Sequence, residues 1–227
     1  MTKKWIVDLA LTGILLLLMG YSLIGEAIHE WLGLAMLLLL LFHHGMNLSW
    51  YRSFRKRWGS PYQCVQTVLH GMLLFAVLGS MVSGLGLSQH ALGFLPPHGG
   101  QELARMVHLP CAYWGFLLMS LHLGLHWSAV MGMVRRITGV QTSSKWRRAL
   151  LRLLAAVIAL DGLCAFFRNG LPDYLFMRTH FLFFPPDQTI LRFLADYLAI
   201  LALFACAGYY GGLLLRRSIS AKTVKDE

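Results

Sequence analysis

The stretch from residue 29 to residue 50 reads HEWLGLAMLLLLLFHHGMNLSW, and a second stretch, from residue 108 to residue 127, reads HLPCAYWGFLLMSLHLGLHW. Each contains two histidines fourteen residues apart, His29 with His43 and His108 with His122. Fourteen residues of α-helix rise about 21 Å and return to within roughly 40° of the same face. Two such helices side by side would present one histidine pair near each surface of a membrane. Facing imidazoles at two depths predict two haem irons, each bound by two histidines, one from each helix.

Composition predicts an all-α, polytopic membrane protein. The 227 residues are 57% hydrophobic and 13% charged, and their mean hydropathy is +0.58, which is well above the value for a soluble domain. A membrane-spanning helix takes about 20 predominantly apolar residues. Six apolar stretches are expected to span the membrane, and they cover residues 6–23, 29–50, 62–87, 104–134, 149–167 and 191–215.

The basic residues lie in four clusters that flank these apolar stretches, and the chain carries a formal charge of +10. The clusters are Lys3 and Lys4; Arg52, Arg55, Lys56 and Arg57; Arg135, Arg136, Lys145, Arg147 and Arg148; and Arg216 and Arg217. A nucleic-acid-binding protein would array its cations on one folded face with aromatic side chains between them, so nucleic acid is not expected as a partner. Because basic residues beside membrane helices mark the cytoplasmic side, both termini are expected in the cytoplasm.

The same topology orders the histidines by depth. The stretches 29–50 and 104–134 both run from the outer to the inner face, so the two helices are expected to be parallel. His29 and His108 would then lie near the outer face, and His43 and His122 would lie nearer the cytoplasm. Ionisable side chains inside a membrane are expensive and usually face a cofactor, a cavity or a partner. His29 has two glutamates close by in sequence, so it could instead be solvated by water at the membrane surface and bind no metal.

The inner histidine pair has competitors at a similar depth, namely His44, His70 and His126. His126 follows His122 by one helical turn, and His70 is the only histidine in the stretch 62–87. Equal spacing favours His43 with His122, and both His70 and His126 remain alternative ligands. The four cysteines form no C-x-x-C pair, so neither a covalently attached c-type haem nor a cysteine-ligated zinc site is indicated. The predicted haems are therefore of the b type.

Four motifs taken together carry a family resemblance. Residues 29–34 read HEWLGL, residues 43–50 read HHGMNLSW, residues 83–88 read SGLGLS, and the fourth motif runs from residue 108 to residue 127. They resemble the flavinylation-associated cytochrome family, formerly a domain of unknown function. That family is similar in design to the cytochrome b subunits of respiratory formate dehydrogenases and nickel-iron hydrogenases. The resemblance covers about residues 5–135.

The resemblance implies a four-helix di-haem core over residues 1–135 in the bacterial inner membrane, with His29, His43, His108 and His122 as iron ligands. Such a core passes electrons between quinone and a partner redox protein, here expected to be a flavoprotein or another redox protein. Residues 136–227 fall outside the family pattern and are expected to add two transmembrane helices with an outer loop.

Two charged residues are further candidates for the site. Arg105 lies one turn before His108, where it is placed to pair with anionic haem propionates. Asp161 lies within the fifth apolar stretch and is a candidate for proton uptake or release at a quinone. The alternatives are an interfacial anchor for Arg105 and a structural hydrogen bond for Asp161.

The sequence contains no nucleophile constellation and no nucleotide-binding motif, so an electron-transfer subunit is expected rather than a complete enzyme. The alternative function is a non-redox membrane transporter or a haem- or metal-handling assembly protein. Transporters more often show inverted repeats, whereas the histidine repeat in this chain is parallel.

Overall fold

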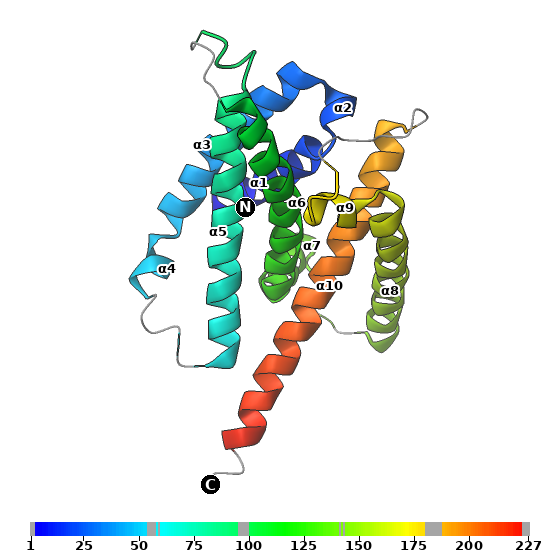
Figure 1. Cartoon of the computed structure of the whole chain (residues 1–227). Helices are drawn as coiled ribbons and strands as arrows, with labels where there is room; N and C mark the ends of the chain where they lie inside the picture. Colours follow the sequence, from blue (N-terminus) through cyan, green and yellow to red (C-terminus); the bar gives the residue numbers. More distant parts are fainter. Residues whose placement is uncertain are drawn as a thin grey trace.

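The computed structural model describes residues 3–53, 58, 60–94, 100–140, 142, 144–179 and 188–223, and it describes side chains as far as residue 217. These residues form helices and no strand (Figure 1), which confirms the all-α prediction. The helices are α1 (Lys3–Leu18), α2 (Tyr21–Ile24), α3 (Glu26–Met46), α4 (Leu48–Arg52), α5 (Pro61–Leu87), α6 (Gln101–Leu125), α7 (Trp127–Thr138), α8 (Lys145–Arg168), α9 (Leu171–Leu175) and α10 (Ile190–Thr223).

Five helices are long and apolar enough to cross a membrane: α3, α5, α6, α8 and the part of α10 that covers Ile190–Arg217. Large apolar side chains on these helices, such as Phe75, Leu160 and Leu191, are exposed on the outside of the protein. Exposed apolar surface of this extent is stable where lipid covers it. The chain is therefore a helical membrane protein in contact with lipid.

The first expected span, residues 6–23, is divided in the structure. α1 has 16 residues, which is about 24 Å of helix at 1.5 Å per residue, whereas the hydrocarbon core of a bilayer is about 30 Å thick. α1 ends at Leu18, and α2 begins at Tyr21 after Met19 and Gly20. The prediction of six spans is thus confirmed for five helices, and a sixth span requires α1 and α2 to cross the membrane together.

Two of the other expected stretches are interrupted beside histidines. Residues 29–50 divide into α3 and α4 at Asn47. The Asn47 amide donates to the carbonyl oxygen of His43 at 2.8 Å and accepts from Lys4 Nζ at 3.2 Å. Residues 104–134 divide into α6 and α7 at His126, whose backbone N–H still donates to the carbonyl of His122. Both interruptions therefore lie close to the inner candidate ligands.

Side-chain caps fix where two of the membrane helices begin. Ser60 precedes α5 and accepts from the backbone N–H of Gln63 at 3.3 Å, and Pro61 occupies the first turn, where no N–H is needed. Ser144 precedes α8 and accepts from the backbone N–H of Arg147 at 3.4 Å. Both helices thus start at residues whose side chains satisfy backbone donors that a helix leaves open.

α3 and α6 run in the same direction, and α5, which connects them, runs back (Figure 1). Among the described residues, the closest association of two helices is that of α5 with α6, whereas α3 packs on α1 far more than on α5. α10 lies along both α6 and α8. α3 and α6, which carry the two fourteen-residue histidine pairs, are therefore parallel, and α5 packs closely on α6.

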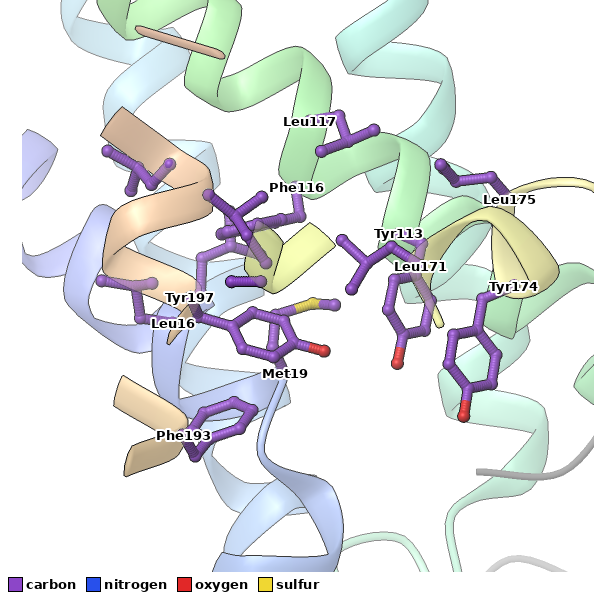
Figure 2. Packing of buried hydrophobic residues seen from close by; sticks show 14 of the residues in the cluster. Leu16, Met19, Tyr113, Phe116, Leu117, Leu171, Tyr174, Leu175, Phe193 and Tyr197 are labelled. Carbon is purple, nitrogen blue, oxygen red and sulfur yellow. The ribbon is translucent and has the colours of Figure 1, made fainter. Parts of the chain in front are cut away.

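The hydrophobic core lies between α6, α9, α10 and the carboxyl-terminal end of α1 (Figure 2). Phe116 of α6 and Leu171 of α9 are completely buried, and Tyr197 of α10 is almost completely buried. Tyr113 of α6 stacks on Tyr174 of α9, with ring centroids 4.5 Å apart. Residues from both predicted regions, 1–135 and 136–227, thus share one core.

Glycines let α10 approach its neighbours at backbone distance. A Cβ atom at Gly124 of α6 would collide with the carbonyl oxygen of Ala205, and one at Gly162 of α8 would collide with that of Ala199. Gly208 of α10 faces the backbone of α6 in the same way. Small residues at such crossings are typical of helices that pack closely within a membrane.

Candidate functional site

The structure brings His29 and His108 together. His29 lies in the first turn of α3 and His108 in the second turn of α6, and their ring centroids are 6.1 Å apart with an interplanar angle of 72°. Two imidazoles on opposite sides of one metal ion, each with a metal–nitrogen bond of about 2 Å, hold their centroids roughly 6 Å apart. The distance between these two rings therefore fits a single iron between them.

The hydrogen bonding of His108 fixes which ring nitrogen can bind a metal. Nδ1 of His108 lies 2.8 Å from the backbone carbonyl oxygen of Ser80 and 3.2 Å from Oγ of Ser83. A carbonyl oxygen only accepts, so Nδ1 carries the proton and donates it to Ser80. In the neutral ring Nε2 is then unprotonated, which is the form that coordinates metal.

The His29 ring is hydrogen-bonded to the backbone of Leu18, but its second nitrogen lacks such support. Nδ1 of this ring is buried and has no hydrogen-bond partner among the described residues. The ring packs edge-on against Tyr21 of α2, with centroids 5.1 Å apart. A buried polar atom that lacks a partner costs about 1–3 kcal/mol, so this imidazole is suited to a ligand that the protein alone does not supply.

His29 and His108 both line a cavity of about 420 Å³. Its other walls come from the carboxyl-terminal end of α1, from α2, α3, α5 and α6, and from the turn after α5, and they are mainly apolar, as with Leu34, Met81 and Leu109. Pockets for cofactors and other small ligands measure about 300–1,000 Å³ and are mostly apolar with a few polar groups. The cavity around His29 and His108 is of this kind.

Glycines leave the cavity open beside the histidines. An added Cβ at Gly33, which lines the cavity, would meet no atom within 4 Å, so a side chain there would enter open space. An added Cβ at Gly84 would lie 3.2 Å from Cε1 of His108, which is tighter than ordinary contact. The absence of a side chain at Gly33 therefore leaves the cavity open, and the absence of one at Gly84 leaves room for the His108 ring.

Arg105 lies where this cavity meets the surface, because it lines the cavity and is itself exposed. A cation there suits the carboxylates of an amphipathic ligand, as the sequence predicts for haem propionates. Tyr21 lines the cavity as well. Its phenol hydroxyl, which is protonated at neutral pH, is available as a hydrogen-bond donor.

The inner histidines are arranged differently from the outer pair. Nδ1 of His43 lies 2.8 Å from Oδ1 of Asp8 on α1. Within the described parts of the chain, the ring of His43 packs against His44, with centroids 5.5 Å apart, rather than against His122. The pairing of His43 with His122 therefore stays a prediction.

A second histidine cluster lies between α5 and α6, where one ligand atom from each of His70, His122 and His126 falls within 4.8 Å of the other two. The ring of His70 is 4.6 Å from that of His122 and stacks on that of His126 at 5.7 Å. Nε2 of Gln66 lies 3.3 Å from Nε2 of His126. Nδ1 of His122 is buried and, among the described residues, has no hydrogen-bond partner. His70 and His126, which the sequence left as alternative ligands for the inner site, thus lie beside the favoured ligand His122.

Several residues at the two sites were not expected from the sequence, namely Asp8, Glu30, Gln66 and Ser80. Asp8 lies close to the basic amino-terminal residues Lys3 and Lys4, where a carboxylate carries no pattern that marks it as a site residue. Ser80 acts through its backbone carbonyl, which no sequence pattern marks. Glu30 accepts hydrogen bonds from the turn after α5, and its position directly after His29 was the one available signal.

The two intramembrane aspartates lie on the α8 and α10 side of the protein. Asp161 is exposed on α8. Asp196 is buried in α10, where it accepts from Arg168 at 2.5 Å and from Asn169 at 2.9 Å. Asp196 is thus a structural link between α10 and the end of α8, and the role predicted for Asp161 stays a prediction.

Comparison of this chain with protein-family models, with curated proteins and with solved structures gives no match.

Proposed function

We propose that this chain is a di-haem b-type membrane cytochrome that transfers electrons across the bacterial inner membrane between quinone and a partner redox protein. One observation carries the proposal: His29 and His108 face each other at a centroid distance of 6.1 Å within a mainly apolar cavity of about 420 Å³. A lone metal ion needs far less space than this, whereas the volume suits a cofactor. The same observation supports the resemblance to the flavinylation-associated cytochromes.

Each residue of the outer site has a defined part in this proposal. His29 and His108 would hold the iron, Ser80 would keep Nε2 of His108 unprotonated, and Arg105 would neutralise propionate carboxylates. A b-type haem would supply a one-electron Fe(III)/Fe(II) couple. The apolar walls exclude water, which is one means by which a protein sets a reduction potential.

For the inner haem, His43 and His122 are the proposed ligands. Asp8 supports His43, because a metal-bound histidine commonly donates its second ring N–H to a carboxylate. That hydrogen bond at Nδ1 leaves Nε2 of His43 as the coordinating atom. His70 and His126 lie beside His122 and remain the alternative ligands.

The partners follow from the position of the haems. Quinone, which dissolves in the bilayer, is proposed as one electron donor or acceptor, and a flavoprotein or another redox protein as the other. The protein partner is proposed at the outer face, close to His29 and His108. Both termini are proposed to be cytoplasmic, in line with the basic clusters.

Haem content tests the proposal directly. Purified full-length protein is expected to contain two b-type haems per chain, measured by a pyridine haemochrome assay with protein quantitation. His29→Ala and His108→Ala are each expected to remove the outer haem and to spare most of the inner one. A wild-type content near zero would contradict the cytochrome function, and a content near one would contradict the second site.

Quinone coupling needs a separate experiment. In proteoliposomes, a menaquinol or ubiquinol analogue is expected to reduce the haems within the turnover time of respiratory proteins, as followed by absorption of the reduced α band. If neither quinol reduces the haems, and reduced haem does not pass electrons back to either quinone, the quinone half of the proposal fails.

The second candidate function is metal or haem handling without electron transfer. The observation in its favour is the cluster of His70, His122 and His126, whose ligand atoms fall within 4.8 Å of one another. Three imidazoles at such spacing suit zinc or copper. Elemental analysis of the purified protein distinguishes the two functions, since one equivalent of zinc or copper without haem would favour this candidate.

A further inference from the structure

Glu30 of α3 binds the turn that follows α5. Its carboxylate accepts from Oγ of Ser88 at 2.7 Å and from the backbone N–H groups of Gln89, His90 and Ala91 at 2.8, 2.8 and 2.7 Å. The Glu30 side chain is only 10% exposed. Hydrogen bonds to an ionised acceptor are roughly twice as strong as neutral ones. We refer to these four bonds as the Glu30 clasp.

The Glu30 clasp joins two walls of the outer cavity. Glu30 directly follows His29, and Ser88, Gln89 and Ala91 line the same cavity as that histidine. α3 packs mainly on α1 and makes little contact with α5. The clasp is therefore the main polar connection described between the helix that carries His29 and the helix pair that carries His108.

We propose that Glu30 is a positioning residue of the outer haem site. By fixing the turn at residues 88–91 against α3, the clasp holds His29 opposite His108 at a separation that accepts one iron. This inference rests on the proposed function, because it assigns a role at the outer haem. Only an ionised carboxylate can accept from four donors at once, since the amide of glutamine would turn a donor toward backbone N–H groups.

The test compares Glu30→Gln with Glu102→Gln, which makes the same chemical change at an exposed position in the first turn of α6. In haem-free full-length protein, hydrogen–deuterium exchange at the amides of residues 89–91 is expected to be at least tenfold faster in Glu30→Gln and unchanged in Glu102→Gln. In haem-loaded protein, the low-spin EPR signal of the outer haem is expected to shift, or that haem to be lost, while the inner-haem signal stays. Ser88→Ala removes one donor and is expected to give a smaller shift at the outer haem alone.

The outcomes separate the inference from the proposed function. A haem-loaded wild type whose Glu30→Gln variant keeps an unshifted outer-haem signal overturns the inference alone. The inference is equally overturned if Glu30→Gln loses both haems while Ser88→Ala leaves the outer signal unchanged, because Glu30 would then act on folding as a whole. A wild-type chain that binds no haem overturns both.

Discussion

His108 and His29 differ in how far the protein prepares them for a metal. The bond from Nδ1 of His108 to the Ser80 carbonyl selects the tautomer and the ring orientation, whereas Nδ1 of His29 has no such partner among the described residues. A ligand that is oriented in advance loses less freedom on binding. His108 is thus oriented at Nδ1 by residues of α5, whereas His29 is hydrogen-bonded to the backbone of Leu18 and keeps Nδ1 without a partner among the described residues.

The contact between Gly84 and His108 gives a test of that fixed position. Gly84→Ala would place a Cβ 3.2 Å from Cε1 of His108, so the ring must shift by a few tenths of an ångström. The outer-haem EPR signal and midpoint potential are expected to change in Gly84→Ala and to stay constant in Gly86→Ala, where the nearest atom is Ala104 Cβ at 3.9 Å. Equal spectra for the two variants would show that the His108 ring is not confined.

Asp8 offers a matching test at the inner site. Its carboxylate accepts from Nδ1 of His43, which stabilises the oxidised iron if His43 is a ligand. Loss of about 0.7–1.4 kcal/mol of such stabilisation corresponds to a rise of roughly 30–60 mV for a one-electron couple. Asp8→Asn is therefore expected to raise the inner-haem midpoint potential in a redox titration, whereas Asp173→Asn, an exposed change on α9, should not. Unchanged potentials in Asp8→Asn would argue against His43 as a ligand.

At the residue level, the sequence predicted which histidines are candidate ligands but not which residues hydrogen-bond to them. The fourteen-residue spacing pointed to His29 and His108, whose rings lie together in the structure. His108 is hydrogen-bonded to α5 and His43 to Asp8 of α1, and pairing between distant segments of this kind leaves no periodic trace in the sequence. The approach of His70 to His122 and His126 likewise depends on how α5 rotates against α6.

The membrane helices are held together by close backbone contact rather than by large interdigitating side chains alone. Gly162 of α8 lies against the carbonyl of Ala199 of α10, and Gly124 of α6 lies against that of Ala205. The two helices can approach this closely at each crossing only because the glycine has no Cβ atom. Overpacking by a single methyl group at such a position costs about 1–3 kcal/mol.

Gly162→Ala is expected to lower the thermal unfolding midpoint of the purified protein by roughly 2–12 °C, taking about 2–4 °C per kcal/mol for a chain of this size. The control is Gly211→Ala in α10, where an added Cβ would meet no atom within 4 Å. The unfolding midpoint of that variant should equal or exceed that of the wild type, because alanine has a higher helix propensity than glycine. A midpoint for Gly162→Ala equal to that of the control would mean that α8 and α10 can separate freely at this crossing.

At the level of elements, hydropathy located the membrane helices well and their interruptions poorly. The expected stretch 62–87 corresponds closely to α5, Pro61–Leu87. The breaks at Asn47 and His126 were missed, because neither residue is glycine or proline and both fall inside stretches that were assigned by their average hydropathy. The Asn47 side chain competes for the backbone carbonyl of His43, a local effect that a hydropathy average does not register.

The number of membrane spans decides whether the two termini lie on the same side of the membrane. Six spans place both termini on one side, and the basic clusters predict that this side is the cytoplasm. A fluorescent protein that matures only in the cytoplasm is expected to be bright when fused at either end. A dark amino-terminal fusion beside a bright carboxyl-terminal one would mean five spans, with α1 and α2 failing to cross.

The shared core also has a consequence for the order in which this protein can be made. α6 carries His108 and His122, and its opposite side is covered by residues of α9 and α10 such as Leu171 and Tyr197. A ribosome synthesises those residues last, so α6 leaves the translocation machinery with that side still unpacked. Segments of a large chain that await a later partner remain exposed in the meantime. Stable loading of the histidine sites should accordingly come after synthesis of α10, which makes cofactor insertion a late event in biogenesis.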